Sequence, residues 1–378
     1  MTQLESRPLD PQARPDFGGL QIIDCDVHTE PGREFNEFLS QEWRQHLALV
    51  GLRSTPRGTP LKLAAHPGAI RLDTTPPSGG SGGSDPGFAR EQLLDEYGLA
   101  AAILSNIKTS SGNMPIGFRV DYARATNDYT MDVWAASDPR WLCSVSTMAS
   151  DPAWSAAEIG RCARKSDRFV QVLLDPHLER PPGDPRYWPI YEAAAEHELP
   201  IAFHVSGRNG DRLSTGVGEQ TFYFETRTSL SAYAKGLVSS LIFERVFDHF
   251  PTLRIALIEL EWTWVVPFSW RLDSTWRVMM NEVPNLKRQP SEYLRDHFWF
   301  TTQPAFDPES ADQRYEVHDQ FEREGFGDRL MFSSDYPHWD MDSPFETTPI
   351  GWSRETKRKV LESNAAALYG LSFVNRES

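Results

Sequence analysis

Cysteine, long apolar runs and basic charge are the features that this sequence has little of. The three cysteines, Cys25, Cys143 and Cys162, are too few and too scattered for a disulfide framework or a thiolate metal site. No stretch approaches the roughly 18 consecutive apolar residues that a membrane-spanning helix needs. The first residues, MTQLESRPLDPQARPDFGG, are polar and contain no apolar signal core. These absences predict a soluble, cytoplasmic protein.

The charge balance narrows the possible partners. The chain has 38 Lys and Arg residues against 53 Asp and Glu residues, which gives a net charge of −15. Nucleic acids and anionic membrane surfaces both require clustered basic residues, so neither is expected as a partner. An apolar content of 39% over 378 residues is enough for a large core. We therefore expect a globular protein whose substrate is a small molecule.

Eight short apolar runs alternate with helix-like stretches along the chain. The runs cover residues 20–28, 100–106, 141–148, 169–176, 199–207, 253–262, 298–304 and 329–338. Helix-like stretches include residues 185–198, 240–250 and 353–370. Strands that alternate with helices predict a parallel sheet, and eight such units are the number in a TIM-type (β/α)8 barrel of the α/β class. We expect an N-terminal arm over residues 1–19 and a single barrel domain over residues 20–372.

Two connections are too long to be simple crossovers between strands. The first runs from residue 29 to about 88 and contains the tract TTPPSGGSGGSDPG (74–87), so a flexible insertion is expected at about 53–88. The second follows the fifth strand, at residues 206–229. The loops that follow the strands of such a barrel build the mouth of the active site. We predict that these two long loops serve as its lid.

Polar residues gather at the ends of the apolar runs. The first run, ending QIIDCDVH, places Asp24, Asp26 and His28 on alternate positions and therefore on one face of a strand. Polar groups there are costly to bury without a function, and holding a metal ion is one. Polar residues also end the later runs: Asp175 and His177, His204, Glu259 and Glu261, Thr302 and Gln303, and Asp335 and His338. Histidines and carboxylates together suit Zn²⁺, Fe²⁺ or Mn²⁺. For Asp24, hydrogen bonding to main-chain amides is the favoured interpretation.

Three segments resemble the amidohydrolase superfamily in their order and spacing. They are Asp-x-His on the first strand, FHVSG (203–207) on the fifth and SSDYPHWD (333–340) on the eighth. The similarity covers residues 20–370 and is to the amidohydrolase-2 branch, which contains aminocarboxymuconate-semialdehyde decarboxylase and the resorcylate-type decarboxylases. The resemblance implies that Asp26, His28, His204 and Asp335 bind a divalent metal. It also implies that Asp335 orients or deprotonates a water on that metal.

One position departs from the decarboxylase pattern. In those enzymes the sixth strand ends in a His that lies beside the metal and acts as acid or base, whereas IALIELEW (255–262) has Glu259 there. Glu259 is thus a candidate metal ligand and a candidate catalytic residue. A second metal site is also possible, and its candidate residues are Glu261, His338, Glu30 and His177. One or two ions per chain are therefore expected, and an oxygen-rich ligand set favours iron or manganese over zinc.

The substrate and the reaction are less constrained. Arg208 is a candidate to pair with a substrate carboxylate, and Trp262 and Trp339 are candidates to line an apolar pocket. The resemblance implies hydrolysis or non-oxidative decarboxylation of a small or acyl-linked carboxylate, with Glu259 or Asp335 moving protons. The alternative is a non-haem di-iron monooxygenase that hydroxylates an acyl-CoA-type natural-product intermediate. By analogy with the branch, we expect a homodimer.

Overall fold

Eight parallel strands form a single sheet in the order of the sequence. The computed structural model describes residues 17–32, 34–49, 70–107, 115–174, 178–205, 222–305, 308, 310–348 and 351–373. Each strand is parallel to the next along the sheet. The strands are β1 (Ile23–His28), β2 (Ala101–Ser105), β3 (Trp141–Ser146), β4 (Phe169–Leu174), β5 (Ile201–His204), β6 (Ile255–Ile258), β7 (Phe298–Thr301) and β8 (Leu330–Met331). Every predicted run contains one of them.

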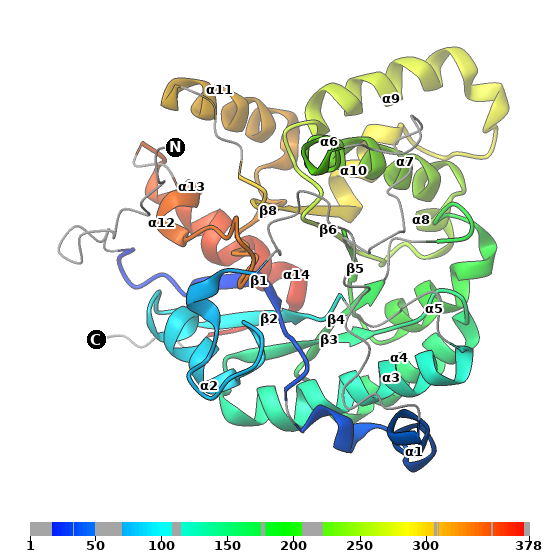
Figure 1. Cartoon of the computed structure of the whole chain (residues 1–378). Coiled ribbons are helices and arrows are strands. Elements are labelled where there is room, and N and C mark those ends of the chain that lie inside the picture. The colour runs from blue at the N-terminus through cyan, green and yellow to red at the C-terminus, as the bar shows by residue number, and fades with distance from the viewer. Residues whose placement is uncertain are drawn as a thin grey trace.

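The helices surround this sheet on its outside (Figure 1). The α-helices are α1 (Gln41–Leu49), α2 (Pro86–Ala89), α3 (Ile116–Tyr129), α4 (Pro152–Lys165), α5 (Trp188–Glu196), α6 (Tyr223–Arg227), α7 (Leu230–Phe243), α8 (Val246–His249), α9 (Val265–Met279), α10 (Pro290–His297), α11 (Ala311–Phe321), α12 (Pro344–Thr347), α13 (Arg354–Arg358) and α14 (Asn364–Tyr369). Single turns of 3-10 or π-helix are η2 (Phe35–Phe38), η3 (Leu72–Thr74), η4 (Arg90–Asp95), η5 (Thr130–Ala135), η6 (Pro185–Tyr187), η7 (Met280–Glu282), η8 (Glu322–Phe326) and η9 (Lys359–Ser363). The predicted TIM-type (β/α)8 barrel is confirmed.

Local sequence signals explain where several helices begin and end. Helix α4 begins after Asp151, whose side chain accepts a hydrogen bond from the Trp154 amide, and Pro152 occupies its first turn. Helix α14 ends at Gly370, which has a left-handed φ of 66° that other residues adopt at a cost. The helix expected over residues 240–250 is divided between α7 and α8, because Arg245 takes a left-handed conformation there.

The last strand returns to the first and nearly closes the barrel. The His28 amide donates to the main-chain oxygen of Tyr336 at 2.7 Å, and the Asp335 amide donates to the main-chain oxygen of Asp26 at 3.1 Å. The end of β1 and the segment after β8, about 300 residues apart in sequence, therefore lie side by side, as the closure of a barrel requires. The closure brings the first and eighth motifs together.

The strands are buried on both faces, as in other barrels of parallel strands. One apolar cluster lies between the strands and the helices. A second, smaller cluster is formed by strand residues that alternate with those of the first, among them Ile103, Ala202 and Ala256. Helix α14 contributes Leu368 and Tyr369 to it. The strands thus hold a packed interior, and only their ends remain for chemistry.

One end of the barrel is covered by the chain itself. Arg254, immediately before β6, donates to the main-chain oxygen of Leu368 in α14 at 2.6 Å. The Tyr369 hydroxyl, also in α14, contacts Gln171 of β4 at 3.0 Å. Helix α14 therefore packs against the amino-terminal ends of the strands. The carboxyl-terminal ends are the other face, where barrel enzymes place their active sites.

The connection between β1 and β2 contacts that other face. Its described part, residues 70–100, includes the tract 74–87, in which the Gly83 oxygen accepts a hydrogen bond from the Glu30 amide at 2.7 Å. Ile70 pairs with His338, so this segment also contacts the eighth-strand motif. Residues 50–69 and 206–221 lie outside the described residues, and the function of both loops as a lid stays a prediction. None of the helices in the described part of the chain combines the length and the apolarity that crossing a bilayer requires.

Candidate metal centre

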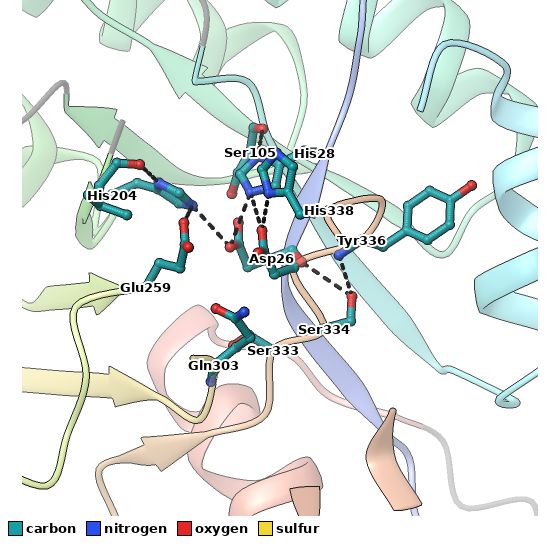
Figure 2. A network of polar contacts seen from close by, with 12 residues as sticks. Asp26, His28, Ser105, His204, Glu259, Gln303, Ser333, Ser334, Tyr336 and His338 are labelled. Carbon is teal, nitrogen blue, oxygen red and sulfur yellow. Dashed lines mark hydrogen bonds and ion pairs between the residues drawn. The ribbon is translucent and has the colours of Figure 1, made fainter. Parts of the chain in front are cut away.

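Four residues from three strand ends converge at the carboxyl-terminal mouth of the barrel. Asp26 and His28 end β1, His204 ends β5 and Asp335 follows β8. One ligand atom each of Asp26, His28 and His204 lies within 4.8 Å of the others. Each of the four residues is at most 3% exposed. Figure 2 shows the two imidazole rings turned toward the Asp26 carboxylate. The ligand set that the resemblance implies is thus assembled in space.

Hydrogen bonds fix the orientation of both imidazole rings. His28 Nδ1 lies 3.0 Å from the main-chain oxygen of Ser105, which can only accept, so Nδ1 carries the proton. His28 Nε2 then lies 2.8 Å from Asp335 Oδ1 and 3.4 Å from Asp26 Oδ2. His204 Nδ1 contacts the main-chain oxygen of Val205, and its Nε2 lies 3.0 Å from Asp26 Oδ2. Both Nε2 atoms therefore face the carboxylates, and such fixed tautomers are typical of histidines that bind metals.

The electrostatics of the cluster favour positive charge. Burial alone would lower the pKa of His28, but Asp26 and Asp335 outweigh it and raise that pKa well above its usual value. The pKa of His204 is also raised, because Asp26 outweighs the effect of burial. Burial would raise the pKa of Asp26, yet the two histidines hold that pKa below its usual range. The site thus stabilises a cation among its side chains.

Two carboxylate oxygens support a metal ion as that cation. Asp26 Oδ1 and Asp335 Oδ2 are buried and have no hydrogen-bond partner among the described residues. A buried carboxylate oxygen without a partner loses its hydration and gains nothing in return, which costs free energy. A divalent ion among two carboxylates and two imidazoles would satisfy these oxygens. The donor set fits Mn²⁺, Fe²⁺ or Zn²⁺.

Asp24 has the structural role that the sequence favours. Its Oδ1 accepts hydrogen bonds from the Ser334 amide at 2.9 Å and from the Asp26 amide at 3.1 Å. Burial raises the pKa of Asp24 to about 7. The carboxylate therefore joins the end of β1 to the segment after β8. It helps to position two metal-ligand candidates and is itself in no ligand group among the described residues.

Glu259 lies beside the cluster and forms an ion pair that the sequence did not indicate. Glu259 Oε2 is 3.7 Å from His204 Nε2, and Oε1 accepts from the Arg227 guanidinium of α6. A second nitrogen of Arg227 pairs with Asp340. Burial and the charge of Asp335 raise the pKa of Glu259, and Arg227 offsets this only in part. Ligand atoms of Glu259, Asp335 and Asp340 also lie within 4.8 Å of one another.

Of the three second-site candidates among the described residues, His338 is the one that the structure brings to the cluster. His338 Nδ1 lies 2.5 Å from Asp335 Oδ1, and its ring is 4.3 Å from that of His28. The main-chain amide of Glu30 bonds to Gly83, and its side chain is in no ligand group among the described residues. His177 lies outside the described residues.

Glu261, another second-site candidate, belongs to no ligand group among the described residues. Its carboxylate bonds to Ser231 and is close to Lys235, both on α7, and burial raises its pKa. Strand β6 ends at Ile258, and Glu259 and Glu261 both adopt left-handed φ values, 56° and 59°. Strand alternation no longer applies beyond Ile258, so the two glutamates do not share a face.

The three candidate substrate-binding residues lie in different environments. Trp262 is 4% exposed and packs against Phe321 of α11 at 5.1 Å between ring centroids, so most of its surface lies in the core. It also lines a small cavity beside Thr302 and Asp342, and its contact with substrate stays a prediction. Trp339 is exposed and directly follows His338. Its contact with substrate stays a prediction, and Arg208 lies outside the described residues.

Two site residues were not among the sequence candidates, although both lie in segments that the sequence singled out. Arg227 is in the long connection 206–229 after the fifth strand, and Asp340 is the last residue of the segment SSDYPHWD (333–340). Their place in the site depends on how α6 and the segment after β8 fold over the mouth of the barrel. Only the tertiary structure shows that both reach Glu259 and its neighbours.

The fold and this centre define a metal-dependent barrel enzyme, and a family comparison specifies it. The sequence model of the family described as Amidohydrolase, the amidohydrolase-2 group, matches residues 23–371. The chain therefore belongs to this amidohydrolase family. A search of the curated proteins found no match.

Solved structures of several decarboxylases share the fold. The 5-carboxyvanillate decarboxylase LigW2 of Novosphingobium aromaticivorans DSM 12444, solved with manganese and a nitrobenzoic acid, is 20% identical, with a TM-score of 0.67 over 94% of this chain and 98% of that chain. The dihydroxybenzoic acid decarboxylase of Polaromonas sp. JS666, solved with manganese and 2-nitroresorcinol, is 20% identical, with a TM-score of 0.64 over 94% and 98%. A 2,6-dihydroxybenzoate decarboxylase bound to 2,6-dihydroxybenzoate is 19% identical, with a TM-score of 0.62 over 93% and 99%. None of these comparisons supports the di-iron monooxygenase alternative.

Proposed function

We propose that this amidohydrolase is a manganese-dependent, non-oxidative decarboxylase of a small carboxylic acid, and that the acid is a hydroxylated aromatic one. The observation that carries the proposal is the buried set Asp26, His28, His204 and Asp335, with two carboxylate oxygens in need of a cation. Two structural neighbours that are named decarboxylases were solved with manganese, which supports the choice of metal. We propose one such ion per chain.

The reaction requires no oxidant or reductant. The bond between the substrate carbon and its carboxylate breaks, the electron pair stays on the carbon, carbon dioxide leaves and the carbon takes up one proton. A bound divalent ion would act as a Lewis acid toward the substrate oxygens. The chain itself must hold the acid in place and deliver the proton.

Glu259 is our candidate for the proton donor, in place of the histidine found on strand six of the related decarboxylases. It is 5% exposed, so bulk water does not compete at its carboxyl group. Its carboxyl oxygen Oε2 lies 3.7 Å from His204 Nε2, next to the ligand set. Asp335 is the alternative donor, but both of its neighbours His28 and His338 favour its charged form. Glu259 is therefore a buried carboxyl group beside the ligand set, and burial raises its pKa, which favours the protonated form that a donor needs.

Two measurements test the proposed function. Elemental analysis of protein purified with added manganese should give one ion per chain, and ¹³C-labelled 2,6-dihydroxybenzoate and 5-carboxyvanillate should release labelled carbon dioxide. In heavy water the product should carry one deuterium at the carbon that lost its carboxylate. Hydrolysis of amides or lactones without release of carbon dioxide from any hydroxybenzoate would contradict decarboxylation. Two ions per chain would contradict the mononuclear site.

The proposal includes a free small-molecule substrate and a cytoplasmic homodimer. The net charge of −15 supports a substrate other than nucleic acid or an anionic membrane surface. The family resemblance supports the dimer. Light scattering on the purified protein should give twice the chain mass of 42.9 kDa, and a value of one chain mass would contradict it.

A further inference from the structure

The mouth of the barrel contains more negative charge than one metal ion can balance. The candidate ligand groups contain the carboxylates of Asp26, Asp335 and Asp340 and, once it has delivered its proton, that of Glu259. A divalent ion balances two of these charges, and among the described residues Arg227 is the arginine that pairs with Glu259 and Asp340. A carboxylate substrate adds one more negative charge in a largely buried site, where repulsion is screened poorly. The position of Arg227 is therefore central to how an acid binds.

Arg227 bonds to two carboxylates that differ in their surroundings. Glu259 has a side chain that is 6% exposed and lies beside His204, whereas the Asp340 side chain is 18% exposed. Asp340 lies in the irregular segment between β8 and α12. Its main-chain oxygen accepts from Gln303 Nε2 at 3.2 Å, so the backbone is held independently of the side chain. The Asp340 carboxylate is thus the partner that an incoming anion can replace.

The guanidinium group is suited to this exchange. Its planar fork binds a carboxylate through parallel N–H donors, and one edge can stay on Glu259 while the other changes partner. The Arg227 side chain is 19% exposed and extends from α6 at the mouth, so a ligand can reach it.

We propose that Arg227 binds the substrate carboxylate, and that Asp340 holds the same edge of the guanidinium in the free enzyme. Arg227 then selects acids over the matching neutral amides, and Asp340 competes with the substrate. The inference rests on the proposed function, since it assigns the group that recognises the acid. It also predicts that substitutions of the two residues of this ion pair change the affinity for acids in opposite directions, lower for Arg227 and higher for Asp340.

The experiment compares binding of hydroxybenzoates with binding of the matching hydroxybenzamides to the manganese-loaded protein, by calorimetric titration. Wild type should bind the acids more tightly than the amides. Arg227→Gln should lower the affinity for the acids by about tenfold or more, the size expected for a charge-assisted hydrogen bond, and leave the affinity for the amides unchanged. Arg227→Lys should restore part of the lost affinity for the acids. Asp340→Asn should bind the acids several-fold more tightly, by about three- to tenfold.

A matched control is Arg288→Gln, which removes an arginine that pairs with Asp296 near the amino-terminal end of β7. This substitution should change neither the affinity for the acids nor the affinity for the amides. Metal content is measured for every variant by elemental analysis. Acids that bind no more tightly than amides in wild type, or no binding of either, would overturn the inference. So would weaker acid binding by Asp340→Asn, or loss of manganese from that variant, which would make Asp340 a metal ligand.

The two proposals fail in different ways. Acid binding that depends on Arg227, without release of carbon dioxide, would reject the decarboxylase and keep the inference. Release of carbon dioxide by Arg227→Gln with an unchanged KM would keep the decarboxylase and reject the inference.

Discussion

His28 Nδ1 donates to the main-chain oxygen of Ser105 at 3.0 Å, and this bond aims Nε2 at the Asp335 carboxylate 2.8 Å away. The ring is buried, so it has little freedom to adopt another orientation. The end of β2 thus positions a ligand candidate that belongs to β1.

We predict that His28→Gln loses metal affinity, by more than about 100-fold, because even residues that only support a metal ligand contribute about 10–100-fold. Dialysis against a metal buffer followed by elemental analysis measures the affinity. His46→Gln, which changes an exposed histidine of α1, is the control and should retain the wild-type metal content. Full manganese occupancy in His28→Gln would show that the ligand set is misassigned.

The Glu259→Gln variant distinguishes two possible roles of Glu259, proton donor and metal ligand. The amide keeps the size and one hydrogen-bond acceptor of the side chain but cannot deliver a proton. We expect kcat to fall by about 10²–10⁴ with the metal content unchanged. Single-turnover kinetics on the manganese-loaded variant check the first expectation and elemental analysis checks the second. If instead manganese is lost along with activity, Glu259 is a ligand.

A buried asparagine next to the barrel should be important for stability. Asn127 of α3 donates from Nδ2 to Glu158 Oε1 at 3.0 Å and to the Ser146 oxygen at 3.2 Å, and its Oδ1 accepts from the Ser146 amide at 2.7 Å. Asn127→Ala leaves these three groups without that partner, so the free energy of unfolding should fall by about 2–4 kcal/mol. Urea unfolding measures it. Gln313→Ala, at an exposed site in α11, should change stability by less than about 0.5 kcal/mol. Equal effects of the two substitutions would refute the role of the network.

Asp138 should contribute stability that depends on pH. Hydrogen bonds from the Arg140 guanidinium hold the pKa of Asp138 below its usual value of 3.8. A carboxyl group whose pKa is lower in the folded state stabilises the fold above its unfolded pKa, and loses that contribution as the pH falls through the folded pKa. Asp138→Asn should therefore cost about 0.5–1 kcal/mol near pH 7 and progressively less below pH 3.8.

Urea unfolding of wild type and Asp138→Asn across this pH range makes the comparison. The exposed Asp319→Asn is the control and should show no difference at any pH. A stability difference that grows as the solution becomes more acidic would have the wrong sign for this mechanism.

The fold was predictable because its signals are local. Each strand is a short buried run, and runs of this kind separated by helices leave few architectures open. The convergence of Asp26, His28, His204 and Asp335 was predictable for a related reason, since in a barrel the carboxyl ends of the strands meet at one mouth. The resemblance then selected these four from the other polar strand ends as candidate ligands.

The rest of the site depends on geometry that no local pattern encodes. Strand alternation would place Glu261 on the same face as Glu259, but it fails where the backbone turns left-handed after Ile258. Trp262 was a candidate because it is aromatic and follows a strand end, and most of its ring packs against α11. Arg227 and Asp340 come from connecting segments that pair only after the barrel has folded. Sequence patterns therefore located the cluster of candidate metal ligands but not the residues of the connecting segments that surround it.

The left-handed backbone at Glu259 and Asp335, with φ values of 56° and 61°, has a consequence for protein engineering. Side chains other than glycine are strained there by about 1–2 kcal/mol per residue. Glycine would relieve that strain, but it would also remove the carboxylates that pair with His28 and Arg227. Leaving a buried partner without its counter-charge costs about 3–5 kcal/mol, which is more than the strain relieved. Any stabilisation programme for this enzyme should therefore keep these two codons fixed from the start.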